Sequence, residues 1–221
     1  MLIVRAEYEV ERIRRSCAFP HAAELQDKKD HLVYAIERVT VDGLWLEFGV
    51  GTGGALRWIS AHTDHMVYGV DWFQGLPESW VLGRGRTACT RAPLGRPPRL
   101  GRENVTLVRG SFRDTLPAFL SAHAGPIAFL HLGRDLYPST RAVLQAVQHR
   151  VVVGSVVVFA ELFNYPNYAD HEMRALLELE AETGLEYEYL AHTADRTAAS
   201  LRITAVSTRF DVANARYWGC K

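Results

Sequence analysis

Four closely spaced glycines and one acid are the residues of this chain whose spacing most directly suggests chemistry. The glycines are Gly49, Gly51, Gly53 and Gly54, and they close an apolar run over residues 44–50. Asp71 ends the next apolar run, residues 66–71. Such glycines allow a tight turn and close backbone approach to a ligand, the helix that follows presents free N–H groups, and an acid on the neighbouring strand can accept from ribose hydroxyls. The pattern predicts a site for a nucleoside cofactor.

The glycine spacing fits two kinds of cofactor. Gly49, Gly51 and Gly54 match the G-x-G-x-x-G turn of dinucleotide sites, whereas Gly49, Gly51 and Gly53 match the G-x-G-x-G turn used for S-adenosylmethionine. The turn by itself leaves both open.

The elements around this turn alternate between strands and helices. We expect strands over residues 44–50, 66–71, 105–109, 127–132 and 156–161, and helices over residues 30–38, 53–62, 114–123, 139–149 and 170–182. The near-continuous apolar runs IAFLHL and VVVF suit strands that are buried on both faces of a parallel sheet. This alternation predicts an α/β fold with a mostly parallel sheet and helices on both faces.

Two stretches near the end of the chain change the pattern. Residues 185–191 and 200–206 alternate apolar and polar side chains, and the eight residues that separate the runs leave no room for a crossover helix. They predict an antiparallel hairpin. A nicotinamide-binding domain would normally continue with further βαβ units, so the hairpin counts against the dinucleotide alternative.

Composition sets broad limits. At 221 residues and 48% hydrophobic content, the chain suits one sizeable domain, and its zero formal charge suggests neither a nucleic-acid nor a membrane partner. Three widely separated cysteines form no C-x-x-C pair, and no apolar run is long enough to span a bilayer. We therefore expect a cytoplasmic protein with a small-molecule substrate; a homodimer stays open.

A long basic segment interrupts the alternation at residues 81–102, which are rich in glycine, proline and arginine and contain no acid until after Arg102. Such insertions are either solvated loops or lids over a substrate. We divide the chain into an N-terminal helical extension (1–30), a main domain (31–206) that contains this loop, and a C-terminal tail (207–221).

Five segments resemble consecutive blocks of one family. They are EFGVGTGGALRWI (47–59), VYGVDWFQGLPESW (67–80), NVTLVRGSFRDTLPAFL (104–120), PIAFLHLGRDLYPSTRAVL (126–144) and GSVVVFAELFNYPNYADHE (154–172). The chain resembles the class I S-adenosylmethionine-dependent methyltransferases, in the branch of the macrocin-type sugar O-methyltransferases. The resemblance implies a Rossmann-like fold with a mostly parallel seven-stranded sheet that ends in an antiparallel hairpin. It also implies S-adenosylmethionine as cofactor and methyl transfer to a small-molecule oxygen in natural-product or saccharide metabolism.

The resemblance assigns the cofactor residues. Glu47 helps to fix the ammonium group of the methionine moiety, and the turn of Gly49, Gly51 and Gly53 accommodates that moiety. Asp71 accepts from the ribose, and Trp72, Phe73, Ser111 and Phe112 lie beside the adenine. Two alternatives stay open: Glu47 can instead cap the next helix, and Trp72 and Phe73 can instead be core residues.

Two of the three positions that hold a metal in the family depart from its pattern. Sugar O-methyltransferases of this branch hold magnesium with one acid after the fourth strand and two after the fifth, and the matching residues here are Gly133, Ala160 and Glu161. Two of the three lack a side-chain oxygen, which Mg²⁺ requires of its protein ligands. We therefore expect no metal.

Without a metal, a side chain must remove the proton of an acceptor hydroxyl, or placement alone must suffice. The candidate bases are His131, Glu161 and His171, although His131 lies inside an apolar strand and can be a core residue. Arg134, Asp135 and Tyr137 are the candidate substrate-binding residues, and Arg134 can hold a carboxylate of the acceptor. The alternatives are a cofactor-binding protein that has lost methyl transfer and, third, an NAD-binding oxidoreductase.

Overall fold

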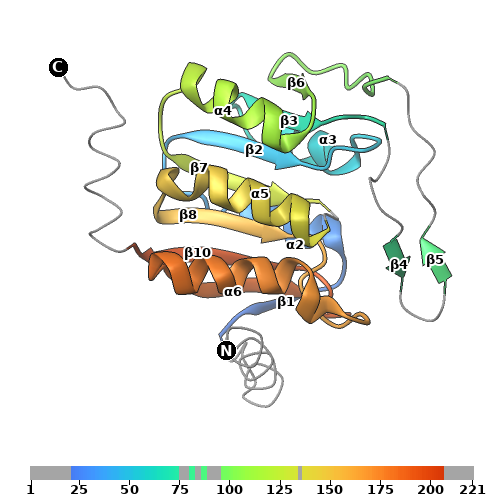
Figure 1. Cartoon of the computed structure of the whole chain (residues 1–221), viewed down its shortest axis with the longest axis vertical. Helices are drawn as coiled ribbons and strands as arrows, with labels where there is room; N and C mark the ends of the chain where they lie inside the picture. Colours follow the sequence, from blue (N-terminus) through green and yellow to red (C-terminus); the bar gives the residue numbers. More distant parts are fainter. Residues whose placement is uncertain (1–20, 75–79, 83–85, 89–95, 134–135, 207–221) are drawn as a thin grey trace.

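An eight-stranded mixed sheet forms the centre of the fold in a computed structural model that describes residues 21–74, 80–82, 86–88, 96–133 and 136–206 (Figure 1). Its strand order is β1-β9-β10-β8-β7-β2-β3-β6. The strands are β1 (Ala23–Leu25), β2 (Leu44–Phe48), β3 (Val67–Asp71), β6 (Val105–Arg109), β7 (Ile127–Leu132), β8 (Val151–Phe159), β9 (Glu186–Thr193) and β10 (Ala199–Ala205).

Five of these strands form the predicted parallel unit. β6, β3, β2, β7 and β8 pair in parallel, and β10 pairs antiparallel with both β8 and β9. The mostly parallel sheet and its closing hairpin are therefore confirmed. Because β2 lies between β3 and β7, the order of the parallel strands reverses at this strand. The glycine turn after β2 therefore lies at the topological switch point, the usual ligand position in such sheets.

The predicted count of seven strands is wrong. The eighth strand is β1, three residues that pair in parallel with β9 at Ala23↔Ala191 through Leu25↔Thr193. So short a segment carries no recognisable period, and it becomes a strand by pairing with the open edge of β9. The remainder of the predicted N-terminal extension, residues 1–20, lies outside the described residues, as does the predicted tail, residues 207–221.

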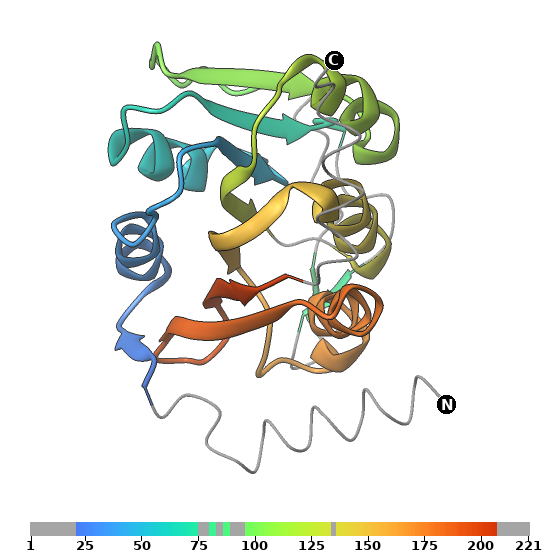
Figure 2. The ribbon, with the colours of Figure 1, turned by 90° about the vertical axis from the view of Figure 1, so that its left-hand side faces the viewer.

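Helices cover both faces of the sheet (Figure 2). On one face lie α2 (Lys28–Ile36) and α3 (Gly54–Ala61), and on the other lie α4 (Phe112–Ala122), α5 (Tyr137–Val147) and α6 (Glu172–Thr183). Short 3₁₀ turns occur at Gln148–Arg150 and Tyr168–Asp170. Helix α2 begins two residues earlier than predicted because the Asp27 carboxylate caps it, accepting from the backbone N–H groups of Lys29 and Asp30 at 2.9 Å.

Side chains of β2 alternate between two cores. Leu46 and Phe48 belong to the core under α4, α5 and α6, whereas Trp45 belongs to the core under α2 and α3. Each fully buried side chain of this size stabilises the fold by about 1.5–3 kcal/mol. The two cores together fix the direction of the strand and of the turn that follows it.

The basic segment contains some regular structure. Strands β4 (Trp80–Leu82) and β5 (Arg86–Ala88) pair as a small antiparallel sheet separate from the main one. Residues 83–85 and 89–95 lie outside the described residues, so a lid function for this segment remains a prediction. Within the described part of the chain, no helix has both the length and the apolarity needed to cross a bilayer.

Candidate functional site

The glycine turn after β2 is tied to the end of β3 by a side chain. Gly49, Gly51 and Gly53 all have positive φ angles, of 83°, 53° and 78°, in the region that favours glycine over any residue with a Cβ atom. The backbone N–H of Gly51 donates to Asp71 Oδ2 at 2.8 Å, and that of Phe73 donates to Asp71 Oδ1 at 2.7 Å. Asp71 thus orders the backbone on which a cofactor would lie, and lone pairs remain on both oxygens for ribose hydroxyls.

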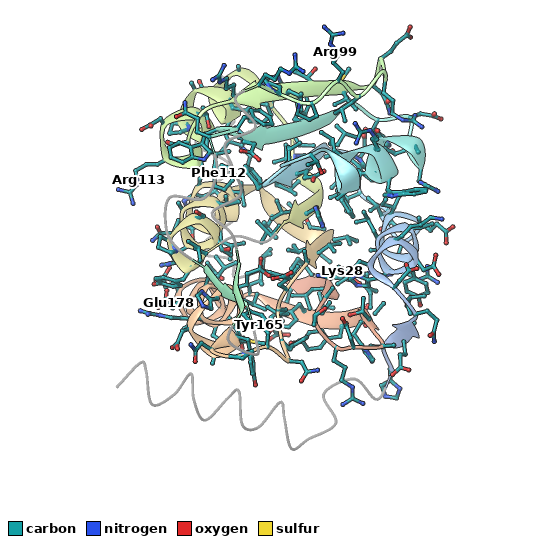
Figure 3. All side chains as sticks on the ribbon, turned by 90° about the vertical axis from the view of Figure 1, so that its right-hand side faces the viewer. Lys28, Arg99, Phe112, Arg113, Tyr165 and Glu178 are labelled. Atoms are coloured by element: carbon teal, nitrogen blue, oxygen red, sulfur yellow. The ribbon has the colours of Figure 1, made fainter. Side chains whose placement is uncertain are left out.

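The end of the basic segment packs against the same turn, a contact that the sequence did not indicate. A Cβ atom built on Gly53 would lie 2.6 Å from Leu100 Cδ2 and 3.2 Å from Pro98 Cγ. The Arg57 guanidinium of α3 donates to the carbonyl oxygen of Arg99 at 3.1 Å, and Arg99 lies at the rim of the view in Figure 3. The end of the basic segment is therefore anchored on the glycine turn.

The predicted adenine residues differ in burial. Phe73 is 2% exposed and belongs to the core under α2 and α3, the alternative that the sequence left open, while Trp72 is half-buried. Ser111 caps α4, since its Oγ accepts from the backbone N–H of Asp114 at 3.3 Å. Phe112, labelled in Figure 3, packs edge-on against Phe48 with ring centroids 5.2 Å apart.

Glu47 and His131 form a buried polar pair. They are register partners on β2 and β7, and Glu47 Oε1 lies 3.8 Å from His131 Nδ1. Burial first, then His31 and Lys28, lower the pKa of His131 to about 3. Although 3.8 Å is within ion-pair distance, the imidazole is therefore neutral at pH 7. A neutral imidazole of such low basicity is a poor proton acceptor, which favours the core alternative for His131.

A second polar cluster lies at the carboxyl end of β8. Lys28 Nζ donates to the carbonyl oxygen of Ala160 at 2.8 Å and to Glu161 Oε1 at 3.3 Å. The backbone N–H of Glu161 donates to Glu172 Oε2 at 3.3 Å, and Glu172 is 1% exposed at the start of α6. Lys28 was not among the predicted site residues, because it precedes the resembling blocks and only the fold of α2 over the sheet brings it here.

Tyrosine and histidine side chains complete this cluster. Burial and the charges of Glu172 and Glu161 raise the pKa of the Tyr165 hydroxyl, which stays protonated at neutral pH. The ring of His171 stacks on that of Tyr165 with centroids 6.1 Å apart, and His171 Nδ1 is buried with no hydrogen-bond partner among the described residues. We call Lys28, Glu161, Tyr165, His171 and Glu172 the β8-end cluster.

The positions implied for magnesium do not fit a metal. Gly133 donates its N–H to the Phe48 carbonyl oxygen at 2.9 Å, and a Cβ atom on it would lie 3.1 Å from the carbonyl oxygens of both Gly49 and Phe48. Ala160 offers no side-chain oxygen, and Glu161 is in contact with Lys28. Among the described residues, no group of three or more histidine, cysteine, aspartate or glutamate side chains is arranged to hold a metal ion.

The predicted substrate residues are only partly described. Arg134 and Asp135 lie outside the described residues. Tyr137 begins α5, and its hydroxyl donates to Glu178 Oε2 of α6 at 2.7 Å while Arg174 lies over its ring. This hydroxyl therefore joins two helices, and a role in substrate binding remains a prediction.

Comparisons of sequence connect this arrangement with known proteins. Residues 98–184 match the family model described as macrocin O-methyltransferase. The 8-demethyl-8-(2,3-dimethoxy-α-L-rhamnosyl)-tetracenomycin-C 4′-O-methyltransferase of Streptomyces olivaceus is 31% identical over an alignment that covers 58% of each chain. The chain thus spans about 58% of the length of this curated relative.

Solved structures share the fold. The O-methyltransferase NovP superposes with a TM-score of 0.60 at 27% identity, covering 80% of both chains. The calicheamicin methyltransferase CalS11 superposes with a TM-score of 0.58 at 22% identity, covering 79% of this chain and 76% of its own. An O-methyltransferase from Bacillus cereus, solved with S-adenosylhomocysteine, superposes with a TM-score of 0.53 at 12% identity and 91% coverage of both chains.

Proposed function

From its confirmed resemblance to the macrocin-type branch of the class I methyltransferases, we propose that this chain is an S-adenosylmethionine-dependent O-methyltransferase. The observation that carries the proposal is the glycine turn after β2, which is bound to the end of β3 by the hydrogen bond from Gly51 to Asp71. This turn lies where the strand order of the parallel sheet reverses. A turn of this form, placed beside an acid at the next strand end, suits the methionine and ribose parts of the cofactor.

The acceptor in this proposal is a sugar hydroxyl of a natural product. The curated relative is named for methylation of a rhamnosyl group, and CalS11 is described as a TDP-rhamnose 3′-O-methyltransferase. When bound, the cofactor supplies its sulfonium methyl group to an acceptor oxygen by in-line displacement. The protein contributes chiefly by positioning the two molecules, with help from a base that takes the hydroxyl proton.

Each predicted cofactor residue has a role in this proposal. Glu47 holds the ammonium group of the methionine moiety, and Gly49, Gly51 and Gly53 provide the backbone surface against that moiety. Asp71 accepts from the ribose hydroxyls. Trp72, Ser111 and Phe112 border the adenine, whereas Phe73 supports this wall from within the core.

Among the candidate bases, Glu161 is the best placed. It lies in the β8-end cluster with a side chain that is 12% exposed, so it can reach an acceptor at the mouth of the site. The neutral, buried His131 is a weaker candidate because its pKa is about 3. His171, whose ring stacks on Tyr165, is the second candidate in the same cluster.

Two measurements test the proposed function. Calorimetry should show binding of S-adenosylhomocysteine and none of NAD. Incubation with methyl-labelled S-adenosylmethionine and either TDP-rhamnose or a rhamnosylated aromatic polyketide should transfer label to the sugar. Binding of the cofactor without transfer to either acceptor would favour a protein that has lost methyl transfer, and binding of NAD alone would favour an oxidoreductase.

A further inference from the structure

Lys28 brings a positive charge to the strand end that the acceptor is expected to approach. It is the first residue of α2, and its side chain crosses to the carboxyl end of β8, where Nζ contacts the Ala160 carbonyl oxygen at 2.8 Å and Glu161 Oε1 at 3.3 Å. In Figure 3, which looks at the carboxyl ends of the strands, Lys28 lies between α2 and these ends. Its side chain is 41% exposed, so a ligand can approach it from solvent.

Helix stability does not explain a lysine at this position. A cation in the first turn of a helix opposes the helix dipole. The next residue shows the ordinary alternative, because Lys29 is exposed and its Nζ lies 4.3 Å from the centroid of the Trp58 ring on the helix surface. The contacts with β8 therefore explain where the Lys28 ammonium lies.

We propose that the Lys28 ammonium is the resident cation of the acceptor site and binds an oxygen of the sugar hydroxyl next to the one that is methylated. An ammonium has three N–H donors, and the described contacts use two of them, on Ala160 and Glu161. The third binds the acceptor. This inference rests on the proposed function for the identity of the ligand, but not for the position of the charge.

The residues at the positions implied for magnesium do not suit a metal ion, which supports this assignment. Of the three positions implied for magnesium, Gly133 and Ala160 lack side-chain oxygens, and the carboxylate of Glu161 is in contact with Lys28. A divalent cation on Glu161 would lie next to a like charge, which opposes its binding.

The charged side chains around Lys28 suit a hydroxyl as the acceptor group. Glu161 and Glu172 both raise the pKa of Tyr165, as nearby negative charges do. The β8-end cluster therefore combines the Lys28 ammonium with these two carboxylates. A hydroxyl can donate to such a carboxylate and also accept from Lys28, whereas an acceptor carboxylate could only accept.

A metal-binding experiment tests the position of the charge without cofactor or acceptor. Mn²⁺ is titrated into the full chain, and free Mn²⁺ is followed by electron paramagnetic resonance. The variants are Ala160→Asp, which restores one oxygen ligand, and Ala160→Asp combined with Lys28→Met, which also removes the ammonium. We expect the double variant to bind Mn²⁺ at least about tenfold more tightly than Ala160→Asp alone, because a like charge in contact is gone.

Matched controls make this result specific. Ala160→Asp with Lys28→Arg keeps the charge and should bind as weakly as Ala160→Asp alone, and Ala160→Asp with Lys29→Met should do the same. Circular dichroism checks that every variant is folded. Equal affinity of the two Lys28 double variants, or wild-type binding as tight as that of the Lys28→Met double variant, would overturn the proposal.

A kinetic experiment tests the ligand. With TDP-rhamnose as acceptor, Lys28→Met should raise the KM for this acceptor about tenfold or more and leave cofactor affinity unchanged, since a charge-assisted hydrogen bond is lost. Lys28→Arg should recover part of that loss, and Lys29→Met should behave as wild type. An unchanged acceptor KM in Lys28→Met would refute the inference, whereas absence of wild-type turnover with both TDP-rhamnose and the rhamnosylated polyketide would instead refute the proposed function.

Discussion

The backbone N–H of Gly51 donates to Asp71 Oδ2 at 2.8 Å, which joins the turn after one strand to the end of the next. The other carboxylate oxygen of Asp71 accepts from Phe73. One side chain therefore shapes the backbone of the cofactor site and, in the proposed function, also contacts the ribose. Changes at Asp71 should affect both stability and cofactor affinity.

Asp71→Ala should weaken S-adenosylhomocysteine binding by about 1–3 kcal/mol, the usual cost of losing hydrogen bonds in a partly buried site. Asp71→Asn should bind more tightly than Asp71→Ala, because it keeps one acceptor oxygen. Calorimetry on folded protein gives both affinities. Asp64→Ala, an exposed position before the opposite end of β3, is the control and should bind as wild type. If Asp71→Ala bound S-adenosylhomocysteine as tightly as the wild type, Asp71 would not contact the ribose.

Gly69→Ala should destabilise the protein by about 1–3 kcal/mol, because adding a methyl group to a filled core forces its neighbours apart. A Cβ atom there would lie 2.6 Å from Leu56 Cδ2 and 2.8 Å from Val50 Cγ2. The packing of α3 on β3 therefore requires glycine at position 69. The matched control is Gly54→Ala, where a Cβ atom meets nothing within 4 Å. Urea denaturation measures both variants, and equal midpoints would contradict this packing.

Two buried histidines should make stability fall in mild acid. Burial is the main cause that lowers the pKa of His31 to about 4 and that of His131 to about 3, so between pH 6.5 and about 4 the unfolded chain binds more protons than the folded one. The contribution of each histidine is complete above pH 6.5 and decreases by roughly 1 kcal/mol per pH unit as the pH falls towards the folded-state value.

Urea denaturation from pH 7 to pH 4.5 measures this slope. His31→Gln removes one titrating group while its amide can still contact Ser200, whose Oγ lies 3.1 Å from His31 Nε2. The slope should therefore be shallower in His31→Gln than in the wild type. Identical slopes in the two proteins would mean that His31 is not buried in its neutral form.

Chelation should leave methyl transfer unchanged. Gly133 and Ala160 provide no side-chain oxygen, and the Glu161 carboxylate already contacts a cation, so the site has too few hard ligands for Mg²⁺. Turnover is measured with labelled cofactor before and after treatment with EDTA, and again with added Mg²⁺. Activity lost to EDTA and recovered with Mg²⁺ would refute metal independence.

Much of the site could be predicted because its residues lie at the ends of strands that the sequence reveals. Gly49, Gly51 and Asp71 follow apolar strands, and parallel strands bring such ends together whatever the rest of the chain does. Burial of individual side chains could not be predicted in the same way. Trp72 and Phe73 are adjacent and both aromatic, yet Trp72 is half-buried while Phe73, with a backbone φ of 59°, lies in the core.

The amino-acid sequence by itself determined the order of the five parallel strands and the helices between them, the closing hairpin, the glycine turn and the absence of side-chain oxygens at Gly133 and Ala160, since local periodicity and residue chemistry carry this information. Tertiary structure alone decided that β1 becomes an eighth strand and that Lys28 meets Glu161, 133 residues later in the chain. The first contact depends on the position of β9 in the sheet, and the second on the packing of α2 against the sheet. Contacts between such distant segments leave no period or spacing in the sequence.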